Sequence, residues 1–237
     1  MIEHIFVFSN ESDLWAVCEQ KLRESVDWVS GTGRRPGVFF SGGGTFIPFY
    51  ERFGDIQGDV FPTDDRMVPE GTVSDTTSML RREWHRKVVE PGSRVVGVER
   101  LGSAQETAAQ YEQKIRTWTE RGGVFAAALL GVGSDGHTAS LFPGQRDMWE
   151  TTQSWVVATE GEQEPLVPRV TVTPELLRTV PRHIYVLMGS GKLPIANAWL
   201  KERKVLPCEL VQPAEERYVL LDSVAARDLD PKTYTRY

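Results

Sequence analysis

A nearly continuous apolar run near the middle of the chain, VFAAALLGVG at residues 124–133, constrains the fold more than any other segment. The run is too short to cross a membrane, and it is bounded by glycines. Apolar residues at successive positions are typical of a parallel strand that is covered on both faces. We therefore expect this segment to lie at the centre of a parallel sheet, between two layers of helices.

Segments with strand-like and helix-like patterns alternate along nearly the whole chain, and no low-complexity linker interrupts them. The short apolar run at residues 5–8, for example, precedes a helical pattern at residues 14–29. Such alternation predicts one α/β domain over residues 1–237, with a doubly wound, mostly parallel, Rossmann-like sheet and helices on both faces. Further strands are expected at residues 37–40, 60–61, 94–98, 155–158, 183–188 and 217–221, and further helices after residue 45, over 74–88, from 103 and over 193–201.

Charge and cysteine content exclude several classes of function. The chain has 27 Lys and Arg against 33 Asp and Glu, a net charge of −6, so its field repels nucleic acids and anionic membranes. No apolar run approaches the ~18 residues of a membrane helix, and the first residues lack the pattern of a signal peptide. Cys18 and Cys208 have no metal-ligand spacing. We expect a cytoplasmic protein that binds neither nucleic acid nor membrane.

Ligands of doubly wound sheets bind beyond the carboxyl ends of the strands, so the segments that follow the expected strands are the first candidates for a site. One of them is SGGGT, residues 41–45, which follows a strand and precedes a helix. Its backbone N–H groups suit a phosphate or another oxygen-rich anion, although a tight turn without a ligand explains the glycines equally well. It lacks the Gly-Lys-Ser/Thr ending of a Walker P-loop.

A second glycine-rich segment, GVGSDG at residues 131–136, follows the central strand and formally matches the G-x-G-x-x-G dinucleotide fingerprint. That fingerprint opens a long helix, whereas Pro143 and Gly144 follow here within about two turns, so we reject it. His137 comes directly after this segment, where its side chain is expected to face the ligand crevice. An imidazole can accept a proton near pH 7, so His137 is a candidate general base, with a structural histidine as the alternative.

Charged residues follow other strands. Asp64-Asp65-Arg66 places two carboxylates and a guanidinium on one turn, which can orient a histidine or hold sugar hydroxyls and phosphate. Arg169 and Lys192 are single cations. Taken alone, each of these charges is explained as a solvated surface charge, but together with SGGGT they would form the positive site that an acidic chain needs to bind a small anion. Because the chain has no G-x-S-x-G elbow, water is the expected nucleophile.

Taken in chain order, these segments resemble the 6-phosphogluconolactonase family. The run LLGVGSDGHTASLFPG, residues 129–144, is similar to the family signature Gly-x-Gly-Pro-Asp-Gly-His-Thr-Ala-Ser-Leu-Phe-Pro. SGGGT, TDDRMVP, PRVTVTPELL and GSGK resemble the family's Ser-Gly-Gly-x-Thr, Asp-Glu-Arg-x-Val-Pro, Arg-Ile-Thr-Leu-Thr and Gly-x-x-Lys segments. The related glucosamine-6-phosphate isomerases share the fold and a Gly-His loop, but they continue with Ile-Ala-Phe-Asn-Glu, which does not follow His137.

The resemblance implies hydrolysis of 6-phospho-D-glucono-1,5-lactone to 6-phospho-D-gluconate, the second step of the oxidative pentose phosphate pathway, without a metal or other cofactor. It implies that His137 activates the attacking water, with Asp65 and Arg66 also in the catalytic group. Asp64 or Asp65 is the candidate to orient the base, whereas Asp135 is read as shaping the loop. Substrate and phosphate binding falls to Ser41, Gly42, Gly43, Thr45, Arg169 and Lys192.

Three residues depart from the family pattern: Ser134 replaces proline, Asp65 replaces glutamate and Asp75 replaces asparagine. Asp75 matters most, because an added carboxylate near an anionic substrate weakens binding unless neighbouring cations compensate. Two other functions stay open, a sugar-phosphate isomerase or deaminase of the same fold and a non-catalytic sugar-phosphate sensor. The expected partner is a small phosphorylated sugar lactone, and the expected assembly is a monomer or a small homo-oligomer.

Overall fold

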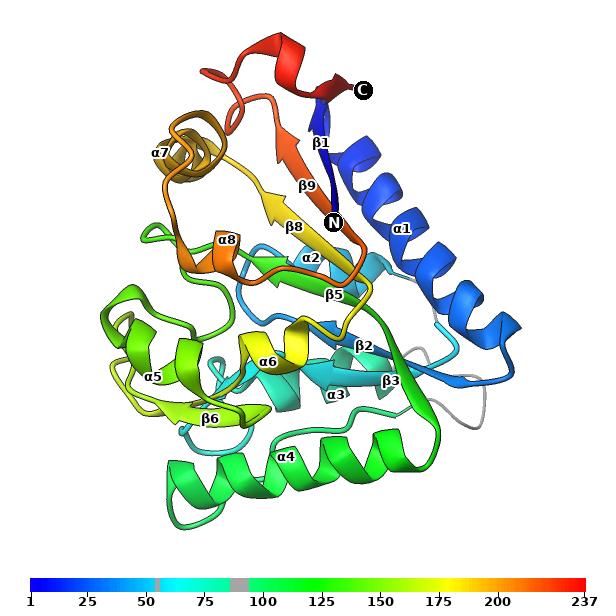
Figure 1. Cartoon of the computed structure of the whole chain (residues 1–237), viewed down its shortest axis with the longest axis vertical. Coiled ribbons are helices and arrows are strands. Elements are labelled where there is room, and N and C mark those ends of the chain that lie inside the picture. The colour runs from blue at the N-terminus through cyan, green and yellow to red at the C-terminus, as the bar shows by residue number, and fades with distance from the viewer. Residues whose placement is uncertain (54–55, 86–93) are drawn as a thin grey trace.

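The computed structural model describes residues 1–53, 56–85 and 94–237, and its strands form two sheets (Figure 1). The larger sheet has seven strands, all parallel to their neighbours, in the order β10-β1-β9-β8-β5-β2-β3. The expected α/β architecture with a mostly parallel sheet is therefore confirmed. The strands of this sheet are β1 (Ile2–Phe8), β2 (Arg35–Phe40), β3 (Asp59–Pro62), β5 (Gly123–Gly131), β8 (Arg182–Leu187), β9 (Glu216–Asp222) and β10 (Thr235–Arg236).

The apolar run forms β5, an interior strand next to the middle strand β8. Its side chains are buried on both faces of the sheet, since Leu129 packs into one core cluster and Leu130 into the other. The first cluster lies under α1 (Glu11–Gly31), α2 (Ile47–Arg52) and α3 (Thr76–His85), and the second under α4 (Ala104–Glu120), α6 (Pro174–Leu177), α7 (Leu193–Ala196) and α8 (Pro207–Leu210). Helices thus cover both faces, as the continuous apolar pattern predicts.

Most helices form where the sequence predicts them. Ser103 and Glu106 form the expected capping box at the start of α4, because each side chain accepts a hydrogen bond from the other residue's backbone N–H. The helix expected over 193–201 forms as α7, which continues into a π-helical turn at Asn197–Lys201. The helix expected over 74–88 forms α3, and its last three expected residues lie outside the described residues. A further short helix, α5 (Arg146–Thr151), follows the glycine-histidine loop.

A second, three-stranded antiparallel sheet was not expected. It has the order β4-β7-β6, with β4 (Asp64–Arg66), β6 (Val156–Thr159) and β7 (Arg169–Val172). The expected parallel strand at 155–158 is therefore corrected to an antiparallel strand of this small sheet. Since β4 follows β3 after a single residue, the small sheet lies at the carboxyl edge of the large one.

The strand expected at residues 94–98 is also corrected, because it is reduced to a single bridge between Val95 and Val60 of β3. Beyond the bridge the backbone turns to α3, where the N–H of Val98 donates to Thr77 Oγ1 at 3.0 Å. A hydrogen bond to a side chain here replaces further pairing with β3. Among the described helices, none has the length and apolar character of a membrane span.

Candidate active site

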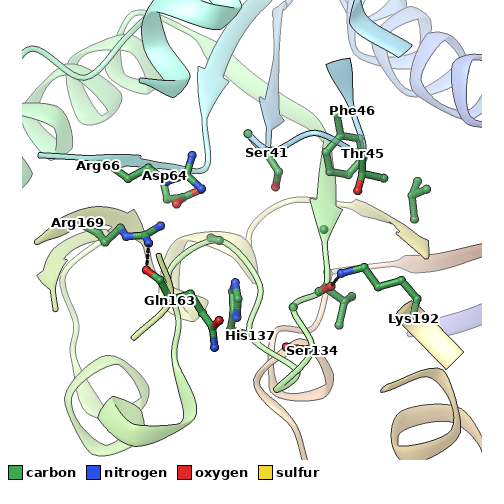
Figure 2. Close-up of a pocket in the computed structure, with 17 residues that line it drawn as sticks. Ser41, Thr45, Phe46, Asp64, Arg66, Ser134, His137, Gln163, Arg169 and Lys192 are labelled. Carbon is green, nitrogen blue, oxygen red and sulfur yellow. Dashed lines mark hydrogen bonds between the residues drawn. The ribbon is translucent and has the colours of Figure 1, made fainter. Parts of the chain in front are cut away.

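A pocket of about 310 Å³ opens where the loops after β2, β5 and β8 meet the small sheet (Figure 2). This is the carboxyl edge of the parallel strands, where ligands of such sheets bind. The lining includes every residue that the sequence analysis placed in the site except Asp65, namely Ser41, Gly42, Gly43, Thr45, Arg66, His137, Arg169 and Lys192. Asp64, Phe46, Ser134 and Gln163 also line it.

The SGGGT loop turns tightly at the end of β2, and two of its glycines are required there. Gly43 has φ +98°, which an L-residue rarely adopts. A Cβ atom on Gly42 would lie 2.6 Å from Thr76 Oγ1 and 3.4 Å from Arg66 Nη1. The loop backbone therefore packs directly against the guanidinium of Arg66, and both face the pocket.

His137 is oriented by Asp135. The Nδ1 atom of His137 lies 2.5 Å from Asp135 Oδ1, which also accepts the backbone N–H of His137 at 3.1 Å. Burial raises the pKa of Asp135, but the hydrogen bonds and charge of His137 outweigh it and lower that pKa to about 2. With a proton on Nδ1 shared with a carboxylate, Nε2 is the nitrogen that accepts a proton from a ligand or water.

The rest of the loop fixes the position of the imidazole ring. The ring packs against Phe142 with centroids 4.7 Å apart. A Cβ atom on Gly133 would lie 2.1 Å from the Nδ1 atom of His137, so only glycine fits at that position. The side-chain amide of Gln163 donates to the second oxygen of Asp135 at 3.4 Å. Gln163 was missed from the sequence, because it arrives on the long loop between β6 and β7 without a local motif.

The neighbouring aspartates of β4 point in opposite directions, as successive residues of a strand do. Asp64 lines the pocket, and its carboxylate accepts hydrogen bonds from Ser140 Oγ at 2.6 Å and Thr63 Oγ1 at 3.1 Å. Asp65 turns away from the pocket and accepts the backbone N–H groups of Thr76 and Thr77, each at 2.9 Å. Its carboxylate therefore holds the start of α3 and does not contact His137.

Two arginines meet at the other side of the pocket, where β4 and β7 pair with Arg66 opposite Arg169. Arg169 is 2% exposed, and its guanidinium donates to the carbonyls of Gln163 at 2.6 Å and Pro165 at 3.1 Å. Within the described residues, neither arginine has an ion pair with a carboxylate, and both Nε atoms are buried without a hydrogen-bond partner. Like charges opposite each other disfavour pairing, so this arrangement suits a bound anion.

Lys192 lies apart from the two arginines, with His137 between them in Figure 2. Its Nζ atom donates to the carbonyl of Val132 at 2.5 Å. Burial lowers the pKa of Lys192, and the charge of Asp135 opposes this shift. Burial, followed by the charge of Arg66, also lowers the pKa of Arg169. The pocket thus combines one oriented imidazole with three cations, which suits proton transfer on a small anionic substrate.

Comparisons with known proteins agree with this description. The family model for glucosamine-6-phosphate isomerases/6-phosphogluconolactonase matches residues 9–220. A 6-phosphogluconolactonase from Rattus norvegicus is 32% identical over 169 residues, which cover 69% of this chain and 65% of the rat protein. The matched segment thus spans slightly less than two thirds of that relative. A 6-phosphogluconolactonase from Homo sapiens is 27% identical over 241 residues, covering 94% of this chain and 92% of the human protein.

Among solved structures, the 6-phosphogluconolactonase from Thermotoga maritima superposes with a TM-score of 0.81 at 24% identity, covering 93% of this chain and 99% of that one. The 6-phosphogluconolactonase from Trypanosoma cruzi gives the same TM-score and identity, with coverage of 97% and 98%. At this identity the superpositions establish the fold, while the family model establishes membership. The chain belongs to the family of glucosamine-6-phosphate isomerases and 6-phosphogluconolactonases.

Proposed function

We propose that this protein hydrolyses 6-phospho-D-glucono-1,5-lactone to 6-phospho-D-gluconate, the second step of the oxidative pentose phosphate pathway. The observation that carries the proposal is the Asp135–His137 pair, placed in a pocket that also contains Arg66, Arg169 and Lys192. The relatives that bear the name 6-phosphogluconolactonase support it. Residues 1–237 would act as one domain in the cytoplasm, without a cofactor.

His137 would act as the general base. Its Nε2 atom takes a proton from water while the water oxygen forms a bond to the lactone carbonyl carbon. Asp135 stabilises the imidazolium that results. The bond from the carbonyl carbon to the ring oxygen then breaks, and the imidazolium returns its proton to the leaving oxygen. No covalent enzyme intermediate is needed, because a lactone is already a reactive ester.

The cations and the SGGGT loop would bind the substrate. Arg66, Arg169 and Lys192 lie on two sides of His137, so between them they can hold the phosphate and stabilise the oxyanion that forms at the carbonyl. Gly42 and Gly43 bring the loop backbone close enough to donate N–H groups, and Thr45 adds a hydroxyl. Asp65 would serve this site indirectly, by holding α3 against it.

The test is hydrolysis of freshly generated 6-phosphogluconolactone, measured against its spontaneous rate. We expect the wild type to accelerate the reaction and His137→Ala to lose about 10²–10⁴-fold in kcat, the range typical of general base catalysis. His4→Ala is the matched control, because His4 lies in β1 and pairs with Glu216 outside the pocket lining. Near-normal turnover by His137→Ala would remove it as the base. A wild type that does not accelerate hydrolysis but converts a ketose or amino-sugar phosphate would instead be an isomerase or a deaminase.

A further inference from the structure

We infer that Arg100 is a positioning residue for substrate binding, which fixes Arg66 in the pocket through its contacts with Asp65, Asp75 and the Arg66 backbone. This inference rests on the proposed function, in which Arg66 contacts the anionic substrate. Arg100 itself does not line the pocket that contains His137. It belongs to the loop that leads into α4, where no sequence motif marks it.

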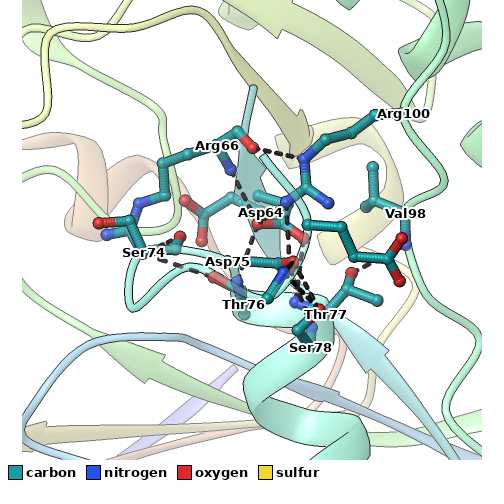
Figure 3. Close-up of polar contacts among 12 residues, drawn as sticks. Asp64, Arg66, Ser74, Asp75, Thr76, Thr77, Ser78, Val98 and Arg100 are labelled. Atoms are coloured by element: carbon teal, nitrogen blue, oxygen red, sulfur yellow. Dashed lines mark hydrogen bonds and ion pairs between the residues drawn. The ribbon is translucent and has the colours of Figure 1, made fainter. Parts of the chain in front are cut away.

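Arg100 connects three separate parts of the chain (Figure 3). Its Nε atom donates to the carbonyl oxygen of Arg66 at 3.0 Å. Its Nη2 atom makes ion pairs with Asp65 Oδ1 at 3.1 Å and with Asp75 Oδ1 at 3.0 Å. The two carboxylates are almost fully buried, at 1% and 0% exposure. Among residues 1–53, 56–85 and 94–237, Arg100 is the cation that pairs with both buried carboxylates, and its removal would leave both without this counter-charge.

The two carboxylates in turn hold the backbone at the start of α3. Asp65 accepts the N–H groups of Thr76 and Thr77, while Asp75 accepts the N–H of Gly71 at 2.8 Å and the N–H of Ser78 at 2.9 Å. The hydrogen bonds from Thr76, Thr77 and Ser78 satisfy N–H groups of the helix start that have no partner inside the helix, and the one from Gly71 holds the loop before it. The position of the first turn of α3 thus depends on both aspartates.

The start of α3 and the loop just before it contact the guanidinium of Arg66 directly. Arg66 Nη1 donates to the carbonyl of Ser74 at 3.3 Å and lies 3.5 Å from Thr76 Oγ1. The backbone N–H of Arg66 also donates to Asp65 Oδ1 at 2.9 Å. Arg66 is therefore held at its backbone by Arg100 and Asp65, and at its guanidinium by the segment that these residues fix.

The same contacts show how the charge of Asp75 is compensated. From the sequence, this carboxylate was expected to weaken anion binding unless neighbouring cations compensate it. Asp75 lies outside the pocket lining. Burial raises its pKa, but hydrogen bonds from Ser78, Gly71 and Arg100 outweigh burial and hold the pKa below its usual value. Asp75 is therefore ionised near neutral pH, and Arg100 is the cation that compensates it.

Charge balance gives the expected result of removing Arg100. Arg100 makes ion pairs with both carboxylates behind Arg66, and its removal leaves each of them without this partner. The guanidinium of Arg66 would then turn from the pocket to the unpaired carboxylates, because an opposite charge in a buried place attracts strongly. Substrate would lose one of its cations, while the Asp135–His137 pair across the pocket would keep its geometry.

The test compares Arg100→Met with the double variant Arg100→Met/Asp75→Asn, which removes one carboxylate together with its counter-charge. For each we measure kcat and KM for the lactone, the Kd of the stable product 6-phosphogluconate by calorimetry, and Tm. We expect Arg100→Met to raise KM and Kd about tenfold, to change kcat less than about threefold, and to lower Tm. Arg178→Met is the control, because Arg178 pairs with Glu175 on an exposed surface.

The double variant separates the effect of Arg100 on the position of Arg66 from its effect on stability. It also keeps the test possible if the single variant does not fold. We expect it to recover most of the Tm while KM and Kd stay raised, because Asp65 still lacks its ion pair with Arg100 and the hydrogen bond to the Arg66 carbonyl is still missing. Arg100→Lys, which keeps the charge, should have intermediate values. A double variant with wild-type KM and Kd would overturn the inference. A wild type that binds 6-phosphogluconate without hydrolysing the lactone would overturn the proposed function only, and the Kd values would then decide the role of Arg100. If the wild type binds neither compound, both are overturned.

Discussion

The aspartates in two walls of the pocket contact different kinds of groups. The β5 wall, residues 131–142, contains Asp135, which is partly exposed and contacts the imidazole of His137. The α3 wall, residues 64–77, contains Asp65 and Asp75, which are buried and contact backbone N–H groups and Arg100. In the proposed function, Asp135 takes part in the chemistry because it contacts His137, the proposed base. A carboxylate that accepts from backbone N–H groups instead fixes the shape of the wall.

The largest effect that tests this comparison is expected in the β5 wall. Asp135→Asn removes the charge that stabilises the imidazolium and favours the wrong tautomer of His137, so kcat should fall about 10²–10³-fold. Steady-state kinetics with 6-phosphogluconolactone provide the measurement. Asp147→Asn, an exposed aspartate of α5, is the control. A kcat within threefold of the wild type would show that the β5 wall does not orient its base through Asp135.

In the α3 wall we expect a substitution to lower stability more than it lowers kcat. In Asp65→Asn an amide nitrogen would face one of the N–H groups of α3, so a buried donor loses its acceptor. We expect the free energy of unfolding to fall by about 2 kcal/mol, while kcat falls less than tenfold. Urea denaturation and kinetics on the same preparation decide between the two roles. A hundredfold loss of kcat at unchanged stability would restore Asp65 to the catalytic group where the sequence placed it.

The difference between the two walls also explains how much of the site could be predicted from the sequence. The β5 wall is one continuous motif, so the strand, the glycines and the position of His137 all follow from neighbouring residues. The orienting role of Asp135 is also local, since it lies two residues before His137, but the sequence analysis gave this role to Asp64 or Asp65. The geometry of this loop alone is enough to identify Asp135 as the hydrogen-bond partner of His137.

The α3 wall could not be predicted in the same way, because its contacts join residues that lie far apart in the sequence. Asp65 bonds to Thr76 and pairs with Arg100, and neither distance along the chain follows a local pattern. The strands β4 and β7 were missed since DDR is short and polar, and Arg169 gave no sign of burial. One signal was present: Asp75 lies three residues before Ser78, where an aspartate that accepts from Ser78 N–H marks a helix start.

A smaller effect is expected for the cations that the two walls and the loop after β8 direct into the pocket. Arg169→Ala and Lys192→Ala should each raise KM for the lactone about tenfold, the loss of one charge-assisted hydrogen bond, with kcat changed less. Initial rates over a range of lactone concentrations give both parameters. An unchanged KM in both variants would remove these cations from substrate binding and leave Arg66 as the cation proposed to bind the anionic substrate.

The smallest expected effect is a difference in how the two aspartates change the stability of the fold with pH: the two dependences have opposite signs. The pKa of Asp135 is lowered in the folded protein from 3.8 to about 2, so its contribution to stability is present above about pH 4 and is lost as the pH falls toward 2. For Asp65, burial raises the pKa above 3.8 in spite of Arg100 and the N–H groups of Thr77 and Thr76. The folded protein then binds the proton of Asp65 more tightly than the unfolded chain does, so stability falls as the pH rises above 3.8.

The two slopes can be measured as differences from matched variants. Free energies of unfolding of the wild type, Asp135→Asn and Asp65→Asn are determined in urea between pH 2 and pH 6. The advantage of the wild type over Asp135→Asn should grow with pH up to about pH 4, whereas its advantage over Asp65→Asn should shrink as the pH rises above that value. Slopes of the same sign would mean that both aspartates interact mainly with opposite charge. The contrast between a carboxylate that serves an imidazole and one buried beneath a helix would then be wrong.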